Sequence, residues 1–231
     1  MADIGWDYGM PLDELCARYR RLYSGPIYDV LERRGLPNQV LHPSIKPIRP
    51  DMVVAGAAVT VKAVMRPRRE GEHPPNPIDG VFPGSVIVYS SEEQASAHFG
   101  ELTAHACAAK GCVGVVVDGG LRDSTKQLQI SAWRPWAAFC RYTSPIELAA
   151  RQRILEINQP IFMSGSLTSV VEVRPYDFVF GDLDGVIIVP REIAVEVLLE
   201  AEDIVQRESQ AREELKRGAS FHDIGQKYRV G

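Results

Sequence analysis

The chain has 231 residues, of which 45% are hydrophobic and 24% charged, the proportions of an ordinary globular protein with a substantial core. Its formal net charge of −4 argues against nucleic acid as a partner, because binding phosphates requires clustered Lys and Arg. No apolar run is long enough to span a bilayer, and the start, MADIGWDYG, lacks a signal-peptide pattern, so we expect no membrane partner and a cytoplasmic location.

Two helices are predicted near the N-terminus, within residues 12–35. Residues 12–24 (LDELCARYRRLYS) and 27–35 (IYDVLERRG) both place apolar side chains at helical spacing. Gly35, with Pro37 two residues later, is typical of a helix end, because glycine readily takes the left-handed conformation that closes a helix.

A core of strands and one further helix is predicted between residues 50 and 190. It begins with MVVAGAAVTVKAV (52–64), a β-rich run typical of buried strands. The next stretch, RPRREGEHPPNP (66–77), is predicted to be a loop because of its prolines and charges, and its length suggests a flap. GVFPGSVIVYSS (80–91) is predicted to be a turn followed by a strand.

A helix over residues 100–111 (GELTAHACAAKG) and a strand over 113–120 (VGVVVDGG) follow from the next part of the chain. The helix starts and ends at a glycine, and Cys107 and Cys112 lie in it or beside it. No cysteine spacing matches a paired metal-ligand motif, so we expect buried free thiols in a reducing compartment.

Later strands and a long polar helix complete the predicted elements, at residues 134–141, 169–173, 185–190 and 191–217. Because strands and helices interleave, the predicted class is α/β with a mostly β core. The whole chain, 1–231, is interpreted as one domain, in which the N-terminal helices, the β/α core and the C-terminal helical tail take up residues 12–35, 50–190 and 191–231.

The segment from Gly100 to Asp123 holds the strongest candidate site. Residues 100–103 would form the first turn of a helix, whose unpaired N–H groups and dipole favour a bound anion. The strand at 113–120 ends in a double glycine, and a sharp turn there would present Arg122 and Asp123 near that helix start.

Arg122 and Asp123 have two interpretations. They could be solvated turn residues or caps of distant backbone groups, since the dipeptide is common. Alternatively, the guanidinium offers a planar fork to a carboxylate or enolate oxygen, and the aspartate offers a hard oxygen ligand to magnesium or manganese. The residues by themselves leave both interpretations open.

The stretch GELTAHACAAKGCVGVVVDGGLRD resembles the signature of the RraA-like family, which includes 4-hydroxy-4-methyl-2-oxoglutarate / 4-carboxy-4-hydroxy-2-oxoadipate aldolases and the regulator of ribonuclease activity A. The resemblance covers nearly the whole chain. IYDVLERRGLP is similar to the family's N-terminal helix, VVAGAAVTVKA to its first core strand, GVFPGSVIVY to its PGDVVVVD segment and GDLDGVIIVP (181–190) to its C-terminal hallmark. It implies a swivelling β/β/α fold and a homo-oligomer, a trimer or a dimer of trimers with sites at subunit interfaces.

The resemblance also implies roles for individual residues. In the family's metal-dependent aldolases, the residue matching Asp123 binds magnesium or manganese, and the one matching Arg122 contacts the pyruvate part of the substrate. Backbone groups matching Gly100, Glu101, Leu102 and Thr103 bind the pyruvate carboxylate. The acidic residue matching Glu101 lies close to the water shell of the metal. Arg122, Asp123 and Glu101 are therefore the expected catalytic residues, with Mg²⁺ or Mn²⁺ as cofactor.

The implied reaction is cleavage of 4-hydroxy-2-oxo dicarboxylic acids to pyruvate and a carbonyl product through an enolate, with oxaloacetate decarboxylation as a side activity. Lys126 departs from the family pattern, which often has Glu or Asp there, and this leaves the substrate open. Two alternatives remain: a non-catalytic regulator that docks on another protein, and a lyase or hydratase of sugar-derived acids whose specificity Lys126 and the 66–77 loop would set.

Other residues near this segment could take part. His98 could touch the substrate or have a structural role, and Asp118 could orient Arg122 or cap the turn. Asp182 and Asp184 are interpreted as turn-forming residues, and the glutamates of the last helix as a solvated face.

Overall fold

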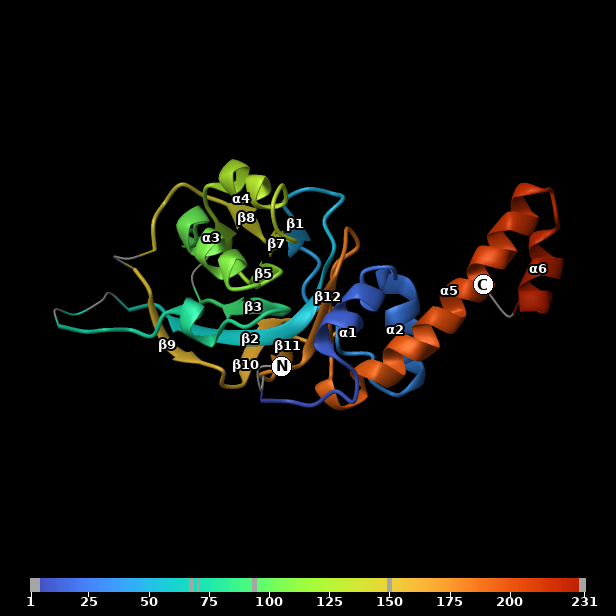
Figure 1. Ribbon diagram of the computed structural model, residues 1–231, viewed down its shortest axis with the longest axis horizontal. Coiled ribbons are helices and arrows are strands. Elements are labelled where there is room, and N and C mark those ends of the chain that lie inside the picture. Colours follow the sequence, from blue (N-terminus) through green and yellow to red (C-terminus); the bar gives the residue numbers. More distant parts are fainter. Residues whose placement is uncertain (1–4, 67–68, 70, 93–94, 149–150, 229–231) are drawn as a thin grey trace.

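The computed structural model describes residues 5–66, 69, 71–92, 95–148 and 151–228 (Figure 1). Its strands are β1 Lys46–Pro47, β2 Val54–Val64, β3 Ser85–Ser90, β4 Ala97–Phe99, β5 Gly114–Val117, β6 Gly120–Leu121, β7 Ala137–Cys140, β8 Tyr142–Thr143, β9 Arg153–Ile157, β10 Ile161–Ser164, β11 Val170–Val173, β12 Phe178–Gly181 and β13 Val186–Val189. Its helices are α1 Leu12–Tyr19, α2 Ser24–Arg33, α3 Glu101–Ala109, α4 Ser124–Ile130, α5 Ala194–Lys216 and α6 Phe221–Tyr228, with 3-10 turns at Pro77–Gly80 and Arg191–Ile193.

An eight-stranded mixed sheet forms the centre of the molecule, in the order β1-β7-β5-β3-β2-β12-β13, with β9 paired to β2. Strands β2, β3, β5 and β7 run parallel, with Ala57 opposite Ser85 and Gly114 opposite Val86. Parallel strands are covered on both faces, so all residues of β5 and β7 are buried. This double covering explains why these strands appear in the sequence as continuous apolar runs.

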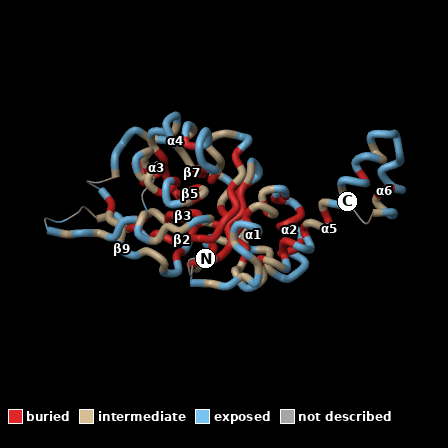
Figure 2. Tube along the Cα trace, viewed as in Figure 1, coloured by how far each residue is buried: buried red, intermediate tan, exposed pale blue. Residues whose placement is uncertain are grey.

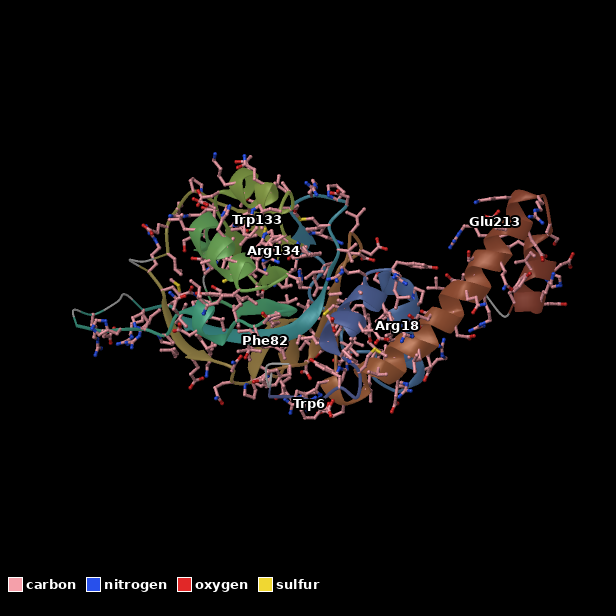
Figure 3. All side chains as sticks on the ribbon, in the orientation of Figure 1. Trp6, Arg18, Phe82, Trp133, Arg134 and Glu213 are labelled. Carbon is pink, nitrogen blue, oxygen red and sulfur yellow. The ribbon has the colours of Figure 1, made fainter. Side chains whose placement is uncertain are left out.

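Helices α1 and α2 pack against α5 and the β12–β13 side of the sheet (Figure 1). The inner sides of both helices are buried (Figure 2), and Tyr19 is completely covered. Arg18 lies between α1 and α5 (Figure 3), with its Nε 2.9 Å from Oε1 of Glu202. Nη1 of Arg34 lies 2.7 Å from Oε2 of Glu196. These two glutamates of α5 therefore pair with the N-terminal helices, while the side chain of Glu196 stays 60% exposed, as expected of a solvated face.

The boundaries of the first two helices also differ from the prediction. Helix α1 ends at Tyr19 rather than at residue 24, and α2 begins at Ser24 rather than at residue 27. Pro26 lies in the first turn of α2, where a missing N–H costs no intrahelical hydrogen bond, so the helix runs through it. The backbone N–H of Ser24 donates to Oδ2 of Asp182 at 2.8 Å, which helps to fix where α2 begins.

Helix α5 leaves the body of the molecule and carries α6 at its far end (Figure 1). Its first half contributes Val197, Leu198 and Ala201 to the core, and in its second half Ala211 is buried. The predicted helix at 191–217 is thus confirmed, preceded by a 3-10 turn. No helix in the described part of the chain is both long and apolar enough to cross a membrane.

The α/β class with an N-terminal helical pair and a C-terminal helix is confirmed. Each predicted strand region contains a strand, and the helix predicted at 100–111 is α3. The prediction lacks α4 and the strands β1, β4, β8, β9, β10 and β12. Helix α4 buries only Gln127 and Ile130 of its seven residues, so its sequence, STKQLQI, carries little apolar periodicity.

Candidate functional site

Two short parallel strands bring the candidate site together. Strand β4 pairs with β6, with Ala97 opposite Gly120 and Phe99 opposite Leu121. The chain leaves β4 into α3 and leaves β6 into α4. Because the carboxyl ends of neighbouring parallel strands lie at the same edge, the start of α3 is placed beside the two residues that follow β6.

The predicted residues Gly100, Glu101, Arg122 and Asp123 meet at this edge. The backbone N–H of Glu101 donates to Oδ2 of Asp123 at 3.4 Å, and that of Arg122 donates to the carbonyl oxygen of Phe99 at 3.2 Å. A Cβ atom at Gly100 would lie 3.1 Å from Nε of Arg122 and 3.3 Å from Oδ2 of Asp123. Glycine at this position therefore lets the Arg–Asp pair approach the helix start closely.

Asp123 has an unusual backbone conformation for a residue with a side chain. Its φ is +56° and its ψ +35°, in the left-handed region, where it forms the N-cap of α4. Asn and Asp tolerate this region better than most residues, and such conformations are concentrated at functional sites. The Gln127 side chain supports the turn, because its Nε2 donates to the carbonyl oxygen of Arg122 at 2.9 Å.

The charges of the cluster are partly exposed. Nε of Arg122 lies 3.3 Å from Oδ2 of Asp123, and Nη1 lies 3.7 Å from Oε1 of Glu147. The side chains of Arg122 and Asp123 are 35% and 41% exposed. Ion pairs at this exposure contribute little to stability, so both groups can exchange their mutual contact for a ligand at small cost.

The first turn of α3 supplies donors and a second carboxylate. Its backbone N–H groups, including those of Leu102 and Thr103, are ones that an α-helix leaves without an intrahelical partner. The side chain of Leu102 projects into solvent, so only its backbone can serve the cluster. Oε2 of Glu101 lies 3.1 Å from Nδ1 of His105, which also lies 2.9 Å from the carbonyl oxygen of Glu101. His105 thereby orients the Glu101 carboxylate.

The side chain of His98 contacts and stabilises the turn at Gly119 and Gly120. The backbone N–H of Gly120 donates to Nδ1 of His98 at 3.1 Å, so Nδ1 acts as the acceptor and Nε2 carries the hydrogen toward Oγ of Ser91, 2.6 Å away. A Cβ atom at Gly119 would lie 2.6 Å from Cε1 of His98, which explains why a side chain is excluded there. These contacts give the two ring nitrogens of His98 a structural role.

Asp118 has partners other than those expected. Its Oδ1 pairs with Nε of Arg141, and its Oδ2 accepts a hydrogen bond from the backbone N–H of Ser164 at 2.8 Å. These contacts join the end of β5 to β7 and β10, across the sheet. The expectation that Asp118 either orients Arg122 or caps the turn is replaced by this bridging role.

Three supporting residues, His98, Gln127 and Glu147, have no local sequence pattern that marks them as parts of the cluster. Gln127 reaches it from the first turns of α4, whereas His98 and Glu147 are brought to it by contacts between distant segments. Lys126 lies exposed in the first turn of α4, and its backbone N–H donates to the carbonyl oxygen of Asp123 at 2.9 Å. Lys126, which stands where the family often has Glu or Asp, is therefore close in the chain to the candidate site.

Fold and cluster together define an α/β protein of the swivelling β/β/α type. The chain belongs to the RraA-like family, since the family pattern described as Aldolase/RraA matches residues 25–188. The resemblance inferred from the sequence and the fold that it implied are thus confirmed.

Known relatives cover most of the chain. A Halalkalibacterium halodurans protein, provisionally named a 4-hydroxy-4-methyl-2-oxoglutarate aldolase, is 30% identical over 208 residues, 87% of each chain. A solved structure described as a novel cellulase from gut-associated microbes superimposes with a TM-score of 0.80 at 29% identity, covering 89% of this chain and 90% of that one. RraAS2 of Streptomyces coelicolor, described as an unusual member of the RNase ES inhibitor family, shares the fold with a TM-score of 0.72 at 23% identity, covering 89% of this chain and 100% of that one.

Proposed function

We propose that the chain is a divalent-metal-dependent carbon–carbon lyase that cleaves 4-hydroxy-2-oxo acids and releases pyruvate. One observation carries the proposal: the Arg122 guanidinium, the Asp123 carboxylate and the first turn of α3 meet at the ends of two parallel strands. The Halalkalibacterium halodurans relative supports the same class, because its provisional name specifies a dicarboxylic 4-hydroxy-2-oxo acid.

Asp123 is the residue that best fits a divalent cation. Its carboxylate is 41% exposed and offers the hard oxygen that Mg²⁺ and Mn²⁺ prefer. Within the described residues, no three His, Cys, Asp or Glu side chains converge as a ligand set, so we expect water and substrate to complete the coordination. A cation bound there would act as a Lewis acid on the 2-oxo group.

Residues of the chain would bind the substrate, stabilise the enolate and accept the proton. The N–H groups at the start of α3 would bind the substrate's carboxylate, and the Arg122 fork would stabilise the enolate oxygen. His105 would orient the Glu101 carboxylate, and a water held by that carboxylate would take the proton of the 4-hydroxyl group. As that proton leaves, C4 becomes a carbonyl and the C3–C4 bond breaks, its electron pair forming the enolate. A proton added at C3 then gives pyruvate.

We also propose that the chain assembles as a homotrimer or a dimer of trimers, with the site at an interface. Two large apolar side chains beside the cluster support this: Leu102 is 79% exposed, and Trp133, which stacks on His105, is 49% exposed. Exposed apolar residues around a site commonly mark a surface that another chain covers.

Pyruvate release coupled to lactate dehydrogenase tests the function directly. With Mn²⁺ or Mg²⁺, we expect turnover of 4-hydroxy-2-oxo acids and of oxaloacetate, and loss of turnover on addition of a chelator. Asp123→Ala and Arg122→Ala are each expected to lower kcat/KM by about 10²–10³-fold, the usual cost of one group that stabilises developing charge.

Asp203→Asn is the matched control, because Asp203 is a 66% exposed carboxylate of α5 that pairs with Arg207 outside the site. It should leave turnover unchanged. If the metal-loaded protein releases no pyruvate from any of these substrates, the lyase proposal is wrong and a non-catalytic regulator becomes the better description. Such a regulator would be indifferent to Asp123→Ala in a partner-binding assay.

A further inference from the structure

A cavity of about 370 Å³ lies next to the candidate site, with Phe99 and Thr103 at the start of α3 among its lining residues. We call it the tail pocket. Its walls are residues 73–77, His98, Phe99, Thr103 and Ile154. The volume falls in the range of pockets that bind small molecules, roughly 300–1,000 Å³.

The tail pocket is continuous with the cluster along the chain. Phe99 and Thr103 line the cavity, and between them Gly100 and Glu101 make the contacts to Arg122 and Asp123. A molecule whose carboxylate is held at the first turn of α3 would therefore have space for its other end in this cavity. Since the reacting carbons lie between those ends, the pocket faces the part of the substrate beyond C4.

The outer wall of the tail pocket is preorganised. Three of its five residues, Pro74, Pro75 and Pro77, have their φ angles fixed by the proline ring. Asn76 caps the 3-10 turn that follows, with its Oδ1 accepting from the N–H of Ile78 at 3.1 Å. The Nζ of Lys110, at the end of α3, donates to the carbonyl oxygen of Ile78 at 3.0 Å and so ties the wall to the helix.

Ion pairs also hold the first half of the 66–77 loop in place. Glu72 pairs with Arg153 of β9 and with Arg66, whose Nη2 lies 3.0 Å from its Oε1. Backbone and guanidinium hydrogen bonds to this carboxylate hold the pKa of Glu72 below its usual value. The flap expected at 66–77 is therefore, over its described residues, an anchored wall, and a wall held in place costs little ordering entropy when it binds a ligand.

The polar side chains of the tail pocket are those of His73, Asn76, His98 and Thr103, and the other lining residues are apolar. None of the lining residues has a carboxylate, ammonium or guanidinium group, and both ring nitrogens of His98 are engaged by Gly120 and Ser91. Because Oδ1 of Asn76 is engaged by Ile78, its amide offers N–H donors, while Thr103 offers a hydroxyl that can donate or accept. Phe99 and the prolines offer apolar surface suited to C–H groups. Above the usual titration range of histidine, a second substrate carboxylate there would lose hydration without a counter-charge, whereas hydroxyl groups would find partners.

We propose that the tail pocket binds an uncharged, hydroxylated tail, so that the preferred substrates are 3-deoxy-2-oxo acids of the sugar-acid type rather than dicarboxylic acids. This inference rests on the proposed lyase function. Cleavage of the C3–C4 bond in a six-carbon member gives pyruvate and a three-carbon hydroxyaldehyde. The 4-hydroxyl oxygen loses its proton as C4 becomes the aldehyde carbon, and C3 of the enolate gains a proton.

Three substrates test this with the metal-loaded wild-type chain at pH 8, above the usual titration range of histidine. They are oxaloacetate, which lacks a tail, 4-hydroxy-2-oxoglutarate, whose tail is a carboxylate, and a six-carbon 3-deoxy-2-oxo aldonic acid, whose tail is a neutral diol. We expect kcat/KM for the aldonic acid to exceed that for 4-hydroxy-2-oxoglutarate by about tenfold or more, the worth of one well-placed hydrogen bond.

Asn76→Ser separates the pocket from the chemistry. Serine can still cap the 3-10 turn, but it lacks the amide N–H donors. This variant is expected to raise KM for the aldonic acid about tenfold while leaving oxaloacetate decarboxylation at the wild-type rate. The oxaloacetate rate shows that the variant is folded and loaded with metal.

The outcomes distinguish the two proposals. Turnover of oxaloacetate and 4-hydroxy-2-oxoglutarate with no preference for the aldonic acid would overturn the tail-pocket inference and keep the lyase. Equal KM values for Asn76→Ser and wild type on the aldonic acid would also overturn it. Absence of pyruvate from all three substrates would overturn the lyase proposal and the inference with it.

Discussion

At the scale of single residues, His98 shows how a side chain behind the site can control it. It is only 6% exposed, and it accepts the N–H of Gly120 through one ring nitrogen while the other faces Ser91. Nε2 of Gln152 donates to the same Ser91 hydroxyl at 2.8 Å. The turn that presents Arg122 is therefore anchored to a chain of buried and half-buried polar groups.

Two conservative variants of His98 separate its two ring nitrogens. In His98→Asn, the amide oxygen can take the place of Nδ1 and keep the hydrogen bond from Gly120. In His98→Gln, the longer side chain reaches toward Ser91 and leaves the buried N–H of Gly120 without its acceptor, at a cost of about 1–3 kcal/mol. We expect His98→Asn to be more stable than His98→Gln by about 1 kcal/mol in urea denaturation.

The same pair should differ in turnover. Because the lost hydrogen bond loosens the turn before Arg122, His98→Gln should show the lower kcat with oxaloacetate, whereas His98→Asn should stay near wild type. Equal stability and equal kcat for the two variants would contradict the role assigned to Nδ1.

At the scale of elements, helices α2 and α3 end in the same hydrogen-bonded motif. After α2, the N–H of Leu36 donates to the carbonyl oxygen of Leu31 and that of Gly35 to Glu32, both at 2.9 Å. After α3, the corresponding donors are Cys112 and Gly111. Each motif places its glycine at positive φ, +76° for Gly35 and +91° for Gly111.

Alanine substitutions at these two glycines should have different costs. At Gly35 a Cβ atom meets nothing within 4 Å, so Gly35→Ala should cost about 1–2 kcal/mol, from the left-handed backbone alone. At Gly111 a Cβ atom would lie 2.9 Å from Cα of Pro83, so Gly111→Ala carries the same strain and a clash besides. Thermal denaturation should show the larger fall in Tm for Gly111→Ala. The reverse order would contradict the packing of α3 against the Pro83 turn.

The elements also show what could be predicted from the sequence. Doubly covered parallel strands appear as apolar runs, so β2, β3 and β5 could be found from their composition alone. Strand β9 is half-exposed and α4 is largely polar, and their positions depend on pairing with distant segments rather than on their own sequences.

The same distinction applies to the candidate site. The helix start at Gly100 and the turn before Arg122 have local signals, so their residues could be named from the sequence. Their proximity comes from the pairing of β4 with β6, two strands of three and two residues that are too short to leave a pattern. Glu147 reaches the cluster from a distant segment and has no such signal, and Gln127 contacts Arg122 from a helix whose polar sequence gives none.

At the scale of the whole molecule, the four cysteines report on global unfolding. All are free and buried. Burial raises the pKa of Cys16 and of Cys107 to about 12 and that of Cys140 to about 11, from an ordinary value of 9.0. Burial also raises the pKa of Cys112. Thiol reagents need an exposed thiolate, so we expect native protein at pH 8 to react only through unfolding, with all four thiols reacting in denaturant.

The raised thiol pKa values make stability fall at alkaline pH. Below about pH 9 the thiols are protonated in both states, so they contribute no pH dependence. Above pH 9 the unfolded chain releases protons that the native state retains up to about pH 11–12, so the free energy of unfolding should decrease through this window. Denaturant titrations at pH 8, 9 and 10 would measure this, and a constant or rising midpoint would contradict it.

The packing of the two ends of the chain has a consequence for synthesis on the ribosome. Helices α1 and α2 emerge long before β12, β13 and α5, which cover the apolar sides of both helices. A nascent chain therefore exposes this surface until residue 204, the last α5 residue in that core, has left the exit tunnel. Helices α1 and α2 must wait until the whole central sheet has been made, which makes this stretch a natural substrate for chaperones during translation.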